Sequence, residues 1–303
     1  MYKVRHWIEF ILYKSITLPF ILLPRSLRMN LGSMLGYVFY YIDYRHRKVT
    51  FRNLEIAFPD KDDSWKKRTA KSSFKFFGRI IGDIITFHKI SRLNFHKYFE
   101  KSINEGHLKN AYKKGKGVLC LAFHFGNWEF LQICANILGY RLASITRRLD
   151  NPLLEREILK IREVTNGAVI YKKNAIRNIR KYLKNGYLIG ILADQNQIVS
   201  EGMFVEFFNN KACTTPSIAL LSLKYDIPIV PVYSLLSENN KYIFYVDKPI
   251  SIQRTGNKNK DIRLLTQKYT TYIENLIRKH PDKWLWMHKR WNTRPEGEPS
   301  LYD

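Results

Sequence analysis

From Gly115 to about residue 246, the sequence alternates between short apolar runs and longer amphipathic stretches. A short continuous apolar run such as residues 118–123 is typical of a strand that is buried on both faces. The stretches between these runs carry apolar residues at helical spacing and basic residues on the opposite side. Strands that alternate with helices predict an α/β fold, a single domain with a largely parallel mixed sheet flanked by helices.

The alternation can be assigned to individual elements, with no repeat, low-complexity tract or long linker between them. We therefore expect one α/β domain over residues 45–303, preceded by an N-terminal helical region at residues 1–44. The predicted strands are residues 118–123, 142–146, 168–171, 187–193, 229–235 and 242–246. The predicted helices are residues 73–98, 128–138, 152–164, 175–184, 216–225 and 261–280.

The N-terminal region contains two apolar stretches, residues 7–23 and 29–42. Neither reaches the roughly 20 apolar residues that a membrane-spanning helix needs, and Glu9, Lys14 and Pro19 interrupt the first. Basic residues flank this stretch and would lie among anionic headgroups. We predict a membrane-associating helical region that lies at the interface; a pair of buried core helices is the alternative.

The chain is strongly basic, with 51 Lys and Arg against 26 Asp and Glu and a formal net charge of +25. Such a charge attracts phosphates, anionic lipids or acidic proteins, and nucleic acid is another common partner of basic chains. Here 18 Phe, 19 Tyr and 6 Trp accompany the charge, a mixture that suits a membrane interface. We expect an anionic membrane surface as a partner and no nucleic acid, and keep a non-catalytic basic module that binds RNA or lipid as an alternative.

Several common kinds of site have no motif in the sequence. The three cysteines form no Cys-x-x-Cys pair, and there is no His-Glu-x-x-His, so we expect no metal site. The serine-hydrolase elbow Gly-x-Ser-x-Gly and the glycine-rich nucleotide loops are also missing. We therefore expect a reaction that needs no cofactor.

Residues 123–129, Phe-His-Phe-Gly-Asn-Trp-Glu, follow the first buried strand of the alternating region. Ligands of open α/β sheets bind at the carboxyl ends of strands, which is where His124 lies. Gly126 allows a tight turn, Asn127 can cap the next helix, and Glu129 falls in its first turn. A carboxylate that holds one imidazole nitrogen leaves the other free to take a proton from an attacking hydroxyl.

This pattern predicts His124 as general base and Glu129 as its orienting partner, in acyl transfer from a thioester to an alcohol. A surface or packing pair of the same two residues is the alternative.

The spacing His-x4-Glu resembles the motif of the glycerolipid acyltransferase superfamily, and its sequence context is similar to that of the late lipid A acyltransferases, the lauroyl and myristoyl transferases. Residues 45–59, Arg147-Arg-Leu-Asp-Asn-Pro-Leu-Leu154, the pair Asp194-Gln195 and residues 207–216 are similar to further segments of that family. The resemblance covers most of residues 1–295.

The resemblance implies a glycerolipid-acyltransferase-like fold and an O-acyltransferase. Its donor would be an acyl carrier protein or acyl-CoA, and its acceptor a hydroxyl of a lipid A precursor or similar glycolipid. The basic segment 172–184 could steer either substrate. The enzyme would lie on the cytoplasmic face of the inner membrane. An acyltransferase that acts on a lysophospholipid, aminolipid or glycosylated phosphoinositide is an alternative.

The resemblance also extends the site beyond the histidine and its carboxylate. Arg162 stands where the family has an active-site arginine, and Arg147 and Asp194 match other site positions. We count Arg147, Arg162, Asp194, Gln195 and Asn127 as the candidate substrate-binding residues.

Overall fold

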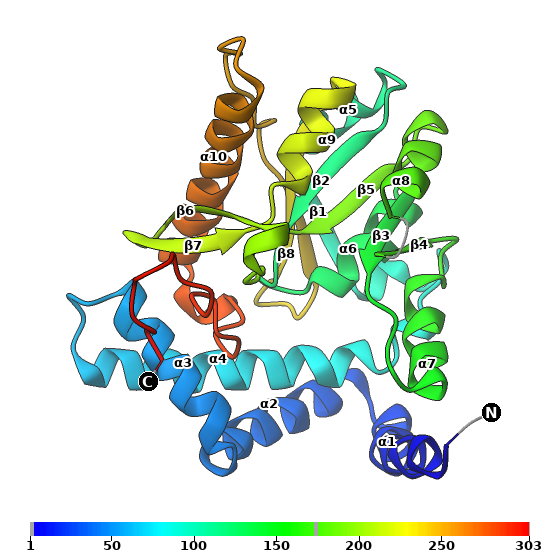
Figure 1. Ribbon diagram of the computed structural model, residues 1–303. Helices are drawn as coiled ribbons and strands as arrows, with labels where there is room; N and C mark the ends of the chain where they lie inside the picture. Colours follow the sequence, from blue (N-terminus) through cyan, green and yellow to red (C-terminus); the bar gives the residue numbers. More distant parts are fainter. Residues whose placement is uncertain (1–2, 173–174, 303) are drawn as a thin grey trace.

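A seven-stranded sheet forms the centre of the molecule in the computed structural model, which describes residues 3–172 and 175–302 (Figure 1). The strand order is β1-β9-β8-β2-β5-β3-β4. Neighbouring strands are parallel except for β8 and β9, so the predicted α/β fold with a largely parallel mixed sheet is confirmed. The strands of this sheet are β1 (Phe99–Ile103), β2 (Val118–Ala122), β3 (Leu142–Thr146), β4 (Ala168–Tyr171), β5 (Leu188–Leu192), β8 (Ile229–Leu236) and β9 (Tyr242–Val246).

Helices cover both faces of the sheet. α5 (Gly106–Tyr112) and α6 (Trp128–Ile137) pack on one face. α8 (Ala175–Lys184), α9 (Ser217–Tyr225) and α10 (Lys258–Lys279) pack on the other. α7 (Pro152–Arg162) connects β3 to β4, and a separate two-stranded hairpin of β6 (Met203–Phe207) and β7 (Asn210–Thr214) contacts α10.

The central strand β2 shows why the apolar runs of the sequence are continuous. Leu119 and Leu121 belong to the cluster beneath α8, α9 and α10, whereas Val118, Cys120 and Ala122 belong to the cluster beneath α6. All five residues are buried. A strand covered on both faces needs apolar residues at every position, and this places the end of β2 in the interior of the fold.

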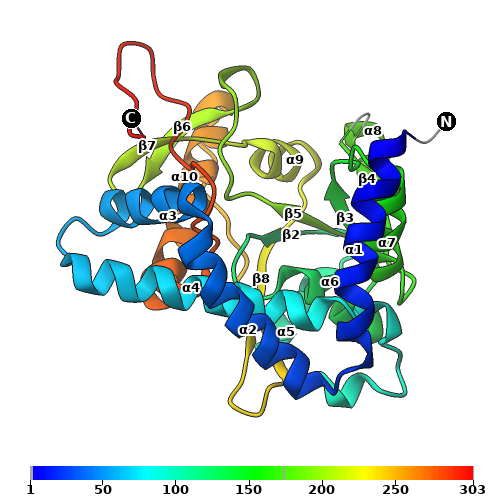
Figure 2. The ribbon, with the colours of Figure 1, turned by 90° about the horizontal axis from the view of Figure 1, so that it is seen from below.

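Four helices form a layer at the carboxyl-end side of β2 and β5, below the sheet in Figure 1 and nearest the viewer in Figure 2. They are α1 (Val4–Leu22), α2 (Arg25–Ile42), α3 (Tyr44–Ala57) and α4 (Asp63–Ile84).

Glycines allow α2 and α4 to pack with their backbones in contact. A Cβ atom at Gly32 would lie 2.3 Å from the carbonyl oxygen of Gly78, and one at Gly36 would lie 2.2 Å from that of Phe74. Gly78 and Gly82 are equally crowded from the α4 side. Only residues without a side chain permit this approach, so the glycines fix the position of α2 against α4.

The helix α1 contacts the rest of the protein through its polar residues. Lys14 Nζ forms a 2.6 Å ion pair with Glu157 of α7. Asn151, at the start of α7, donates 2.9 Å hydrogen bonds to Glu9 Oε2 and to the carbonyl oxygen of His6. The polar residues that interrupt the apolar run are therefore those that hold α1 in place.

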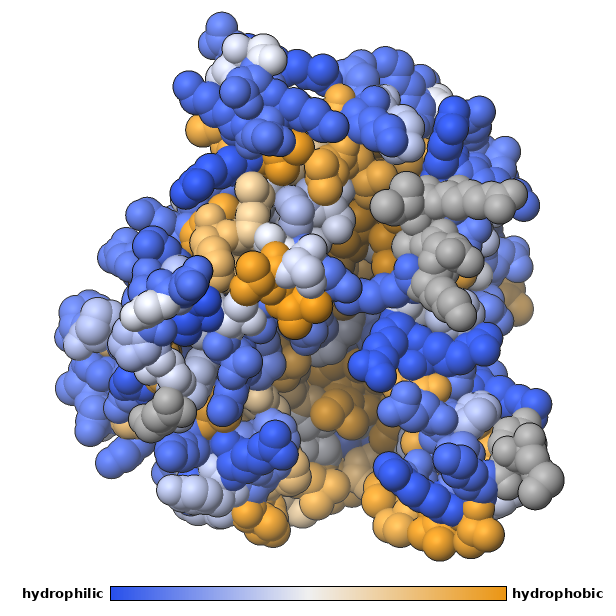
Figure 3. Space-filling view, viewed as in Figure 1, coloured by the Kyte–Doolittle hydropathy of each residue, from blue (hydrophilic) through white to orange (hydrophobic). Residues whose placement is uncertain are grey.

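Most of the large apolar residues of α1 are exposed. Figure 3 shows hydrophobic side chains gathered along the lower edge of the molecule, where α1 and α2 lie. α1 is thus not the buried core helix of our alternative interpretation, and membrane association of residues 1–44 stays a prediction. The large apolar side chains exposed on α1 are Val4, Trp7, Ile8, Ile11, Leu12, Ile16, Leu18 and Leu22.

Across the described ranges, no helix combines the length and the hydrophobicity that would be needed to cross a membrane.

The sequence-based prediction was wrong about one long helix and missed three strands and the helices α3 and α5. The helix expected at residues 73–98 is α4, Asp63–Ile84, which begins earlier because Asp62 accepts a 2.6 Å hydrogen bond from the backbone of Trp65. The residues after α4 form two short 3-10 turns instead of continuing the helix. The strands β1, β6 and β7 were not predicted.

Candidate active site

His124 and Asp194 lie at equivalent positions on two neighbouring parallel strands. β2 and β5 pair in register up to Ala122 and Leu192, and each of the two residues follows its strand by two positions. His124 Nδ1 lies 2.9 Å from Asp194 Oδ1, and the backbone N–H of His124 donates a 2.9 Å hydrogen bond to Asp194 Oδ2. The carboxylate therefore holds both the ring and the backbone of His124.

The Asp194 carboxylate is fully buried and ionised. Burial alone would raise the pKa of Asp194, but the attraction of His124 and the hydrogen bonds from His124 and Trp284 outweigh it and hold the pKa below its ordinary range. Trp284 supplies a 2.7 Å hydrogen bond from Nε1 to Asp194 Oδ2. An ionised carboxylate accepts a hydrogen bond from Nδ1–H and so selects the tautomer in which His124 Nε2 is unprotonated.

The C-terminal segment around Trp284 also fixes the turn that follows His124. Leu285 N–H donates to the carbonyl oxygen of His124, and Gly126 N–H donates to that of Lys283, both at 2.9 Å. Gly126 has a φ of +60°, and a Cβ atom there would lie 1.9 Å from the carbonyl oxygen of Ser234. Glycine is therefore required at this point of the turn.

Trp284 was missed by the sequence-based prediction, although tryptophans at residues 284, 286 and 291 form an unusual run near the C-terminus. All three are buried. The run signals a structured segment, but nothing in it identifies the residue that reaches Asp194.

The structure corrects the predicted partner of His124: that partner is Asp194, and Glu129 binds Arg162 instead. Glu129 Oε1 and Oε2 accept hydrogen bonds of 2.7 Å and 3.1 Å from Arg162 Nη2 and Nε. Arg162 Nη1 also donates a 2.8 Å hydrogen bond to Thr146 Oγ1. Burial would lower the pKa of Arg162, but the hydrogen bond and charge of Glu129 raise it, so the guanidinium stays charged.

Two further side chains lie against the His124 ring. The ring contacts Trp128 edge-on, with centroids 4.8 Å apart. Gln195 Nε2 lies 3.4 Å from His124 Nε2, at the position where an acceptor hydroxyl would approach the ring. Of the predicted substrate-binding residues, Gln195 and Asp194 are therefore brought together with His124.

Asn127 and Arg147 have other surroundings. Asn127 is buried, accepts a hydrogen bond from the backbone of Phe130 and donates one to Tyr242 Oη, so its side chain caps α6 as expected and does not face open space. Arg147 is exposed and lies 3.5 Å from Asp150 in the loop after β3. Both residues remain candidates for substrate contact by prediction only.

A largely apolar pocket of about 80 Å³ opens beside the Glu129–Arg162 pair. It lies between α6 and the strands β2, β3 and β5, and Gly190 leaves room on the β5 side. Figure 3 shows the surface hollowed between α4 and the lower ends of the strands, with hydrophobic residues along the walls. The apolar lining residues are Cys120, Ala122, Leu131, Leu142, Ile145, Leu192 and Val232.

Within the described part of the chain, no group of three or more His, Cys, Asp or Glu side chains is arranged to hold a metal ion.

Comparison with known proteins identifies the family. A family model described as bacterial lipid A biosynthesis acyltransferase matches residues 1–293. The chain belongs to this family. This lipid A acyltransferase is 25% identical to a lipid A biosynthesis acyltransferase of Haemophilus influenzae, in a match that covers 98% of this chain and 93% of the relative.

Two relatives from Escherichia coli K12 are similar to it over comparable lengths. The lipid A biosynthesis lauroyltransferase is 23% identical, over 98% of this chain and 95% of the relative. The lipid A biosynthesis palmitoleoyltransferase is 25% identical, over 92% and 90%. A solved 1-acyl-sn-glycerophosphate acyltransferase from Thermotoga maritima aligns over 82% of this chain and 98% of that one, with a TM-score of 0.35 and 12% identity. The structural similarity is therefore weak.

The predicted family and the predicted enzyme class are therefore confirmed. The chain is an acyltransferase of lipid A biosynthesis, and such an enzyme uses an acyl donor and a lipid acceptor.

Proposed function

We propose that this chain transfers a fatty acyl group from a thioester, carried by acyl carrier protein or coenzyme A, to a hydroxyl of a lipid A precursor or similar glycolipid, with His124 as general base. The observation that carries the proposal is the 2.9 Å contact between His124 Nδ1 and the buried Asp194 carboxylate. It supports a tautomer with the hydrogen on Nδ1, which leaves the Nε2 lone pair facing the substrate to accept a proton.

The reaction follows from this arrangement. The acceptor hydroxyl takes the place of the Gln195 amide, 3.4 Å from His124 Nε2, and gives its proton to that nitrogen as its oxygen attacks the thioester carbonyl. The tetrahedral intermediate then collapses, the carbon–sulfur bond breaks, and the proton on His124 passes to the departing thiolate. Asp194 stabilises the imidazolium while it exists.

Arg162 supplies positive charge beside the reacting groups, and Glu129 positions it. The two hydrogen bonds of 2.7 Å and 3.1 Å form a bidentate pair, which fixes the plane of the guanidinium. Both side chains are only partly buried, with about a fifth of each exposed, so Arg162 can reach an anionic group of a substrate. Glu129 would then contribute to catalysis through Arg162 and not through His124.

The apolar pocket beside this pair suits the hydrocarbon chain of the donor. Trp128 lines the pocket and also contacts the His124 ring, so a chain in the pocket would enter next to the general base. Apolar walls favour a fatty acyl chain because its burial removes hydrocarbon from water.

The exposed apolar side of α1 supports attachment to a membrane, on the cytoplasmic face of the inner membrane where lipid acceptors would be reached. Its polar residues Glu9 and Lys14 are occupied by α7. A helix whose hydrophobic side faces outward and is flanked by basic residues is suited to the bilayer interface.

The test is His124→Ala, with purified enzyme, an acyl thioester and a lipid A precursor, and mass spectrometry of the product. We expect kcat to fall by about 10²–10⁴-fold, the contribution of a general base, with membrane binding unchanged. His96→Ala, at an exposed histidine, is the matched control and should keep full activity.

Full activity of His124→Ala would contradict the proposed mechanism. A wild-type enzyme that acylates a lysophospholipid but no lipid A precursor would contradict the proposed acceptor.

A further inference from the structure

A large hollow lies away from the candidate active site, beside α3. It has a volume of about 750 Å³ and is bounded by α3, the end of α2, the start of α4 and the C-terminal segment. Among the described residues, none that lines it also lines the apolar pocket beside Arg162. We call it the α3 pocket.

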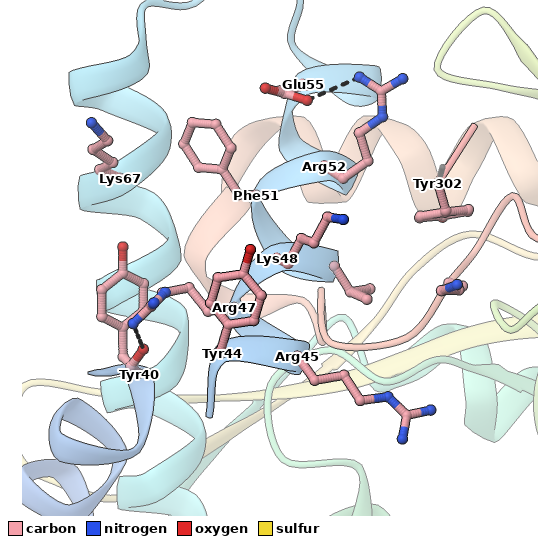
Figure 4. A pocket seen from close by; sticks show the side chains of 12 residues that line it. Tyr40, Tyr44, Arg45, Arg47, Lys48, Phe51, Arg52, Glu55, Lys67 and Tyr302 are labelled. Atoms are coloured by element: carbon pink, nitrogen blue, oxygen red, sulfur yellow. Dashed lines mark hydrogen bonds and ion pairs between the residues drawn. The ribbon is translucent and has the colours of Figure 1, made fainter. Parts of the chain in front are cut away.

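The α3 pocket is strongly basic. Among the described residues that line it, Glu55 is the only acidic one, and it is already paired with Arg52 at 2.9 Å. Figure 4 shows the α3 side chains along one wall, Lys67 reaching from α4, and Tyr302 across from them. An unbalanced group of this kind attracts an anion with several oxygen atoms, such as a phosphate. The basic residues are Arg45, Arg47, Lys48, Arg52, Lys67 and Lys289.

Part of this basic group is held in place by the protein. Arg47 Nη1 donates hydrogen bonds of 3.0 Å and 2.9 Å to the carbonyl oxygens of Tyr40 and Tyr41, and its guanidinium lies over the rings of Tyr40 and Tyr44. Arg52 Nε donates a 2.6 Å hydrogen bond to the carbonyl oxygen of Leu301. These contacts leave the shape of the pocket defined before a ligand arrives.

The other part is available to a ligand. Within residues 3–172 and 175–302, the side chains of Arg45, Lys48 and Lys67 form no hydrogen bond or ion pair. All three are exposed. The α3 pocket therefore combines arginines held in place by the protein with three cationic side chains whose N–H groups can donate hydrogen bonds to a ligand.

The surroundings of the pocket favour a lipid over an acidic protein. Tyr40 and Tyr44, which line it, continue into an exposed apolar and aromatic surface at the end of α2, formed by Tyr37, Val38, Phe39, Tyr41 and Ile42. Lys71 and Lys75 of α4 lie over the rings of Tyr41 and Tyr37. Aromatic rings, apolar side chains and lysines side by side on one surface are typical of a protein face that lies in the headgroup region of a bilayer.

We propose that the α3 pocket binds the phosphate headgroup of an anionic membrane phospholipid while the apolar end of α2 contacts the acyl region beside it. This is a second lipid site, independent of the acceptor site at His124. It would give the enzyme a preference for anionic membranes that does not depend on catalysis.

The test measures binding of the full chain to vesicles of phosphatidylcholine with and without 20% phosphatidylglycerol. We compare the wild type with Arg45→Ala/Lys48→Ala/Lys67→Ala. The matched control removes one exposed arginine and two exposed lysines at the start of α10, on the opposite side of the molecule in Figure 1: Lys258→Ala/Lys260→Ala/Arg263→Ala. The single variant Lys48→Ala repeats the test if the triple variant has a lowered melting temperature.

We expect the pocket variant to bind phosphatidylglycerol vesicles at least tenfold more weakly, since each basic residue near a membrane surface contributes about 1 kcal/mol. The control should bind like the wild type, and soluble glycerol phosphate at millimolar concentration should not compete if the bilayer lipid is the ligand.

Three outcomes would overturn the proposal. Equal weakening in the control would show a diffuse charge effect. Unchanged vesicle binding together with lost binding to an acidic acyl carrier protein would assign the pocket to the donor. If the pocket variant lost acyl transfer in detergent without phosphatidylglycerol, the α3 pocket would instead bind the acceptor.

Discussion

At the scale of single residues, His124 is held by the carboxylate of Asp194, which follows the neighbouring strand β5, and not by that of Glu129 in the next helix, α6. Asp194 contacts both the Nδ1 and the backbone N–H of His124, and Trp284 holds the second carboxylate oxygen. Glu129, five residues after His124, instead forms an ion pair with Arg162. The two acidic residues therefore have separable roles.

The variant Asp194→Asn separates them. An amide in place of the carboxylate would donate to Nδ1 and favour the tautomer with a proton on Nε2, so we expect kcat to fall by about 10²–10⁴-fold with KM changed little. Glu129→Gln should keep the base intact and mainly raise KM for the anionic substrate. Steady-state kinetics on both variants decide the matter, and a fully active Asp194→Asn alongside an inactive Glu129→Gln would restore the pairing predicted from the sequence.

His288 predicts a pH dependence of stability. Burial lowers the pKa of His288 from 6.5 to about 4, although the charge of Asp194 opposes the shift. Below pH 6.5 the unfolded chain takes up a proton that the folded protein excludes, so stability falls as the pH drops from about 6.5 to about 4 and is regained on return.

The expected loss over that range is about 2–3 kcal/mol from this residue. Urea unfolding at pH 7, 6, 5 and 4 measures this loss of stability, and His288→Asn should flatten its dependence on pH. An unchanged slope in that variant would show that another group titrates.

At the scale of secondary structure elements, apolar strands could be predicted and polar ones could not. Residues 142–146, 168–171 and 242–246 were predicted with the bounds that β3, β4 and β9 have, even though β4 is an edge strand, because their apolar residues leave a clear pattern. The edge strand β1, Phe99–Ile103, carries Glu100, Lys101 and Ser102, and such a polar edge leaves little hydrophobic signal.

The hairpin β6–β7 leaves only a weak signal in the sequence, the asparagines at residues 209 and 210. Phe208 and Asn209 have φ values of +51° and +57°, as a two-residue hairpin turn requires, and asparagine is common there. In the candidate site, the position of His124 after a strand could be predicted from the sequence. Its partner Asp194 could not, because it depends on β5 lying next to β2, and the order of strands in the chain does not reveal this.

The pocket between α6 and the sheet leads to a prediction about chain length. The Cβ of a residue at position 190 would meet Leu142 Cδ2 at 3.5 Å, an ordinary contact, so Gly190→Ala should be tolerated and Gly190→Val should fill part of the pocket. We expect Gly190→Val to shift the preferred donor towards shorter acyl chains. Competition between thioesters of different length, with mass spectrometry of the products, tests this, and an unchanged product distribution would place the acyl chain elsewhere.

At the scale of the whole molecule, the layer of α1 to α4 separates an apolar outer surface from the sheet (Figures 1 and 3). If α1 lies in a bilayer interface, Ile8→Asp/Ile11→Asp should reduce vesicle binding strongly, because both side chains are more than half exposed and would carry charge into the apolar region. Flotation with vesicles measures the effect.

Leu220→Asp/Leu264→Asp, at exposed leucines of α9 and α10 on the far side of the sheet, is the matched control. Equal binding of the wild type and the α1 variant would refute the assignment of α1 to the membrane.

The glycine contacts between α2 and α4 have a geometric consequence for an enzyme that works on a lipid. With Gly32 and Gly36 seated against Gly78 and Gly82, α2 cannot slide along α4 without a backbone clash. The same α4 carries Asp83, which binds Arg25 and Tyr242, and Tyr242 in turn accepts a hydrogen bond from Asn127 beside the catalytic turn. If α1 and α2 lie on a bilayer as proposed, the height of His124 above the lipid is a constant of the fold, and an acceptor hydroxyl must lie at a matching depth to be acylated.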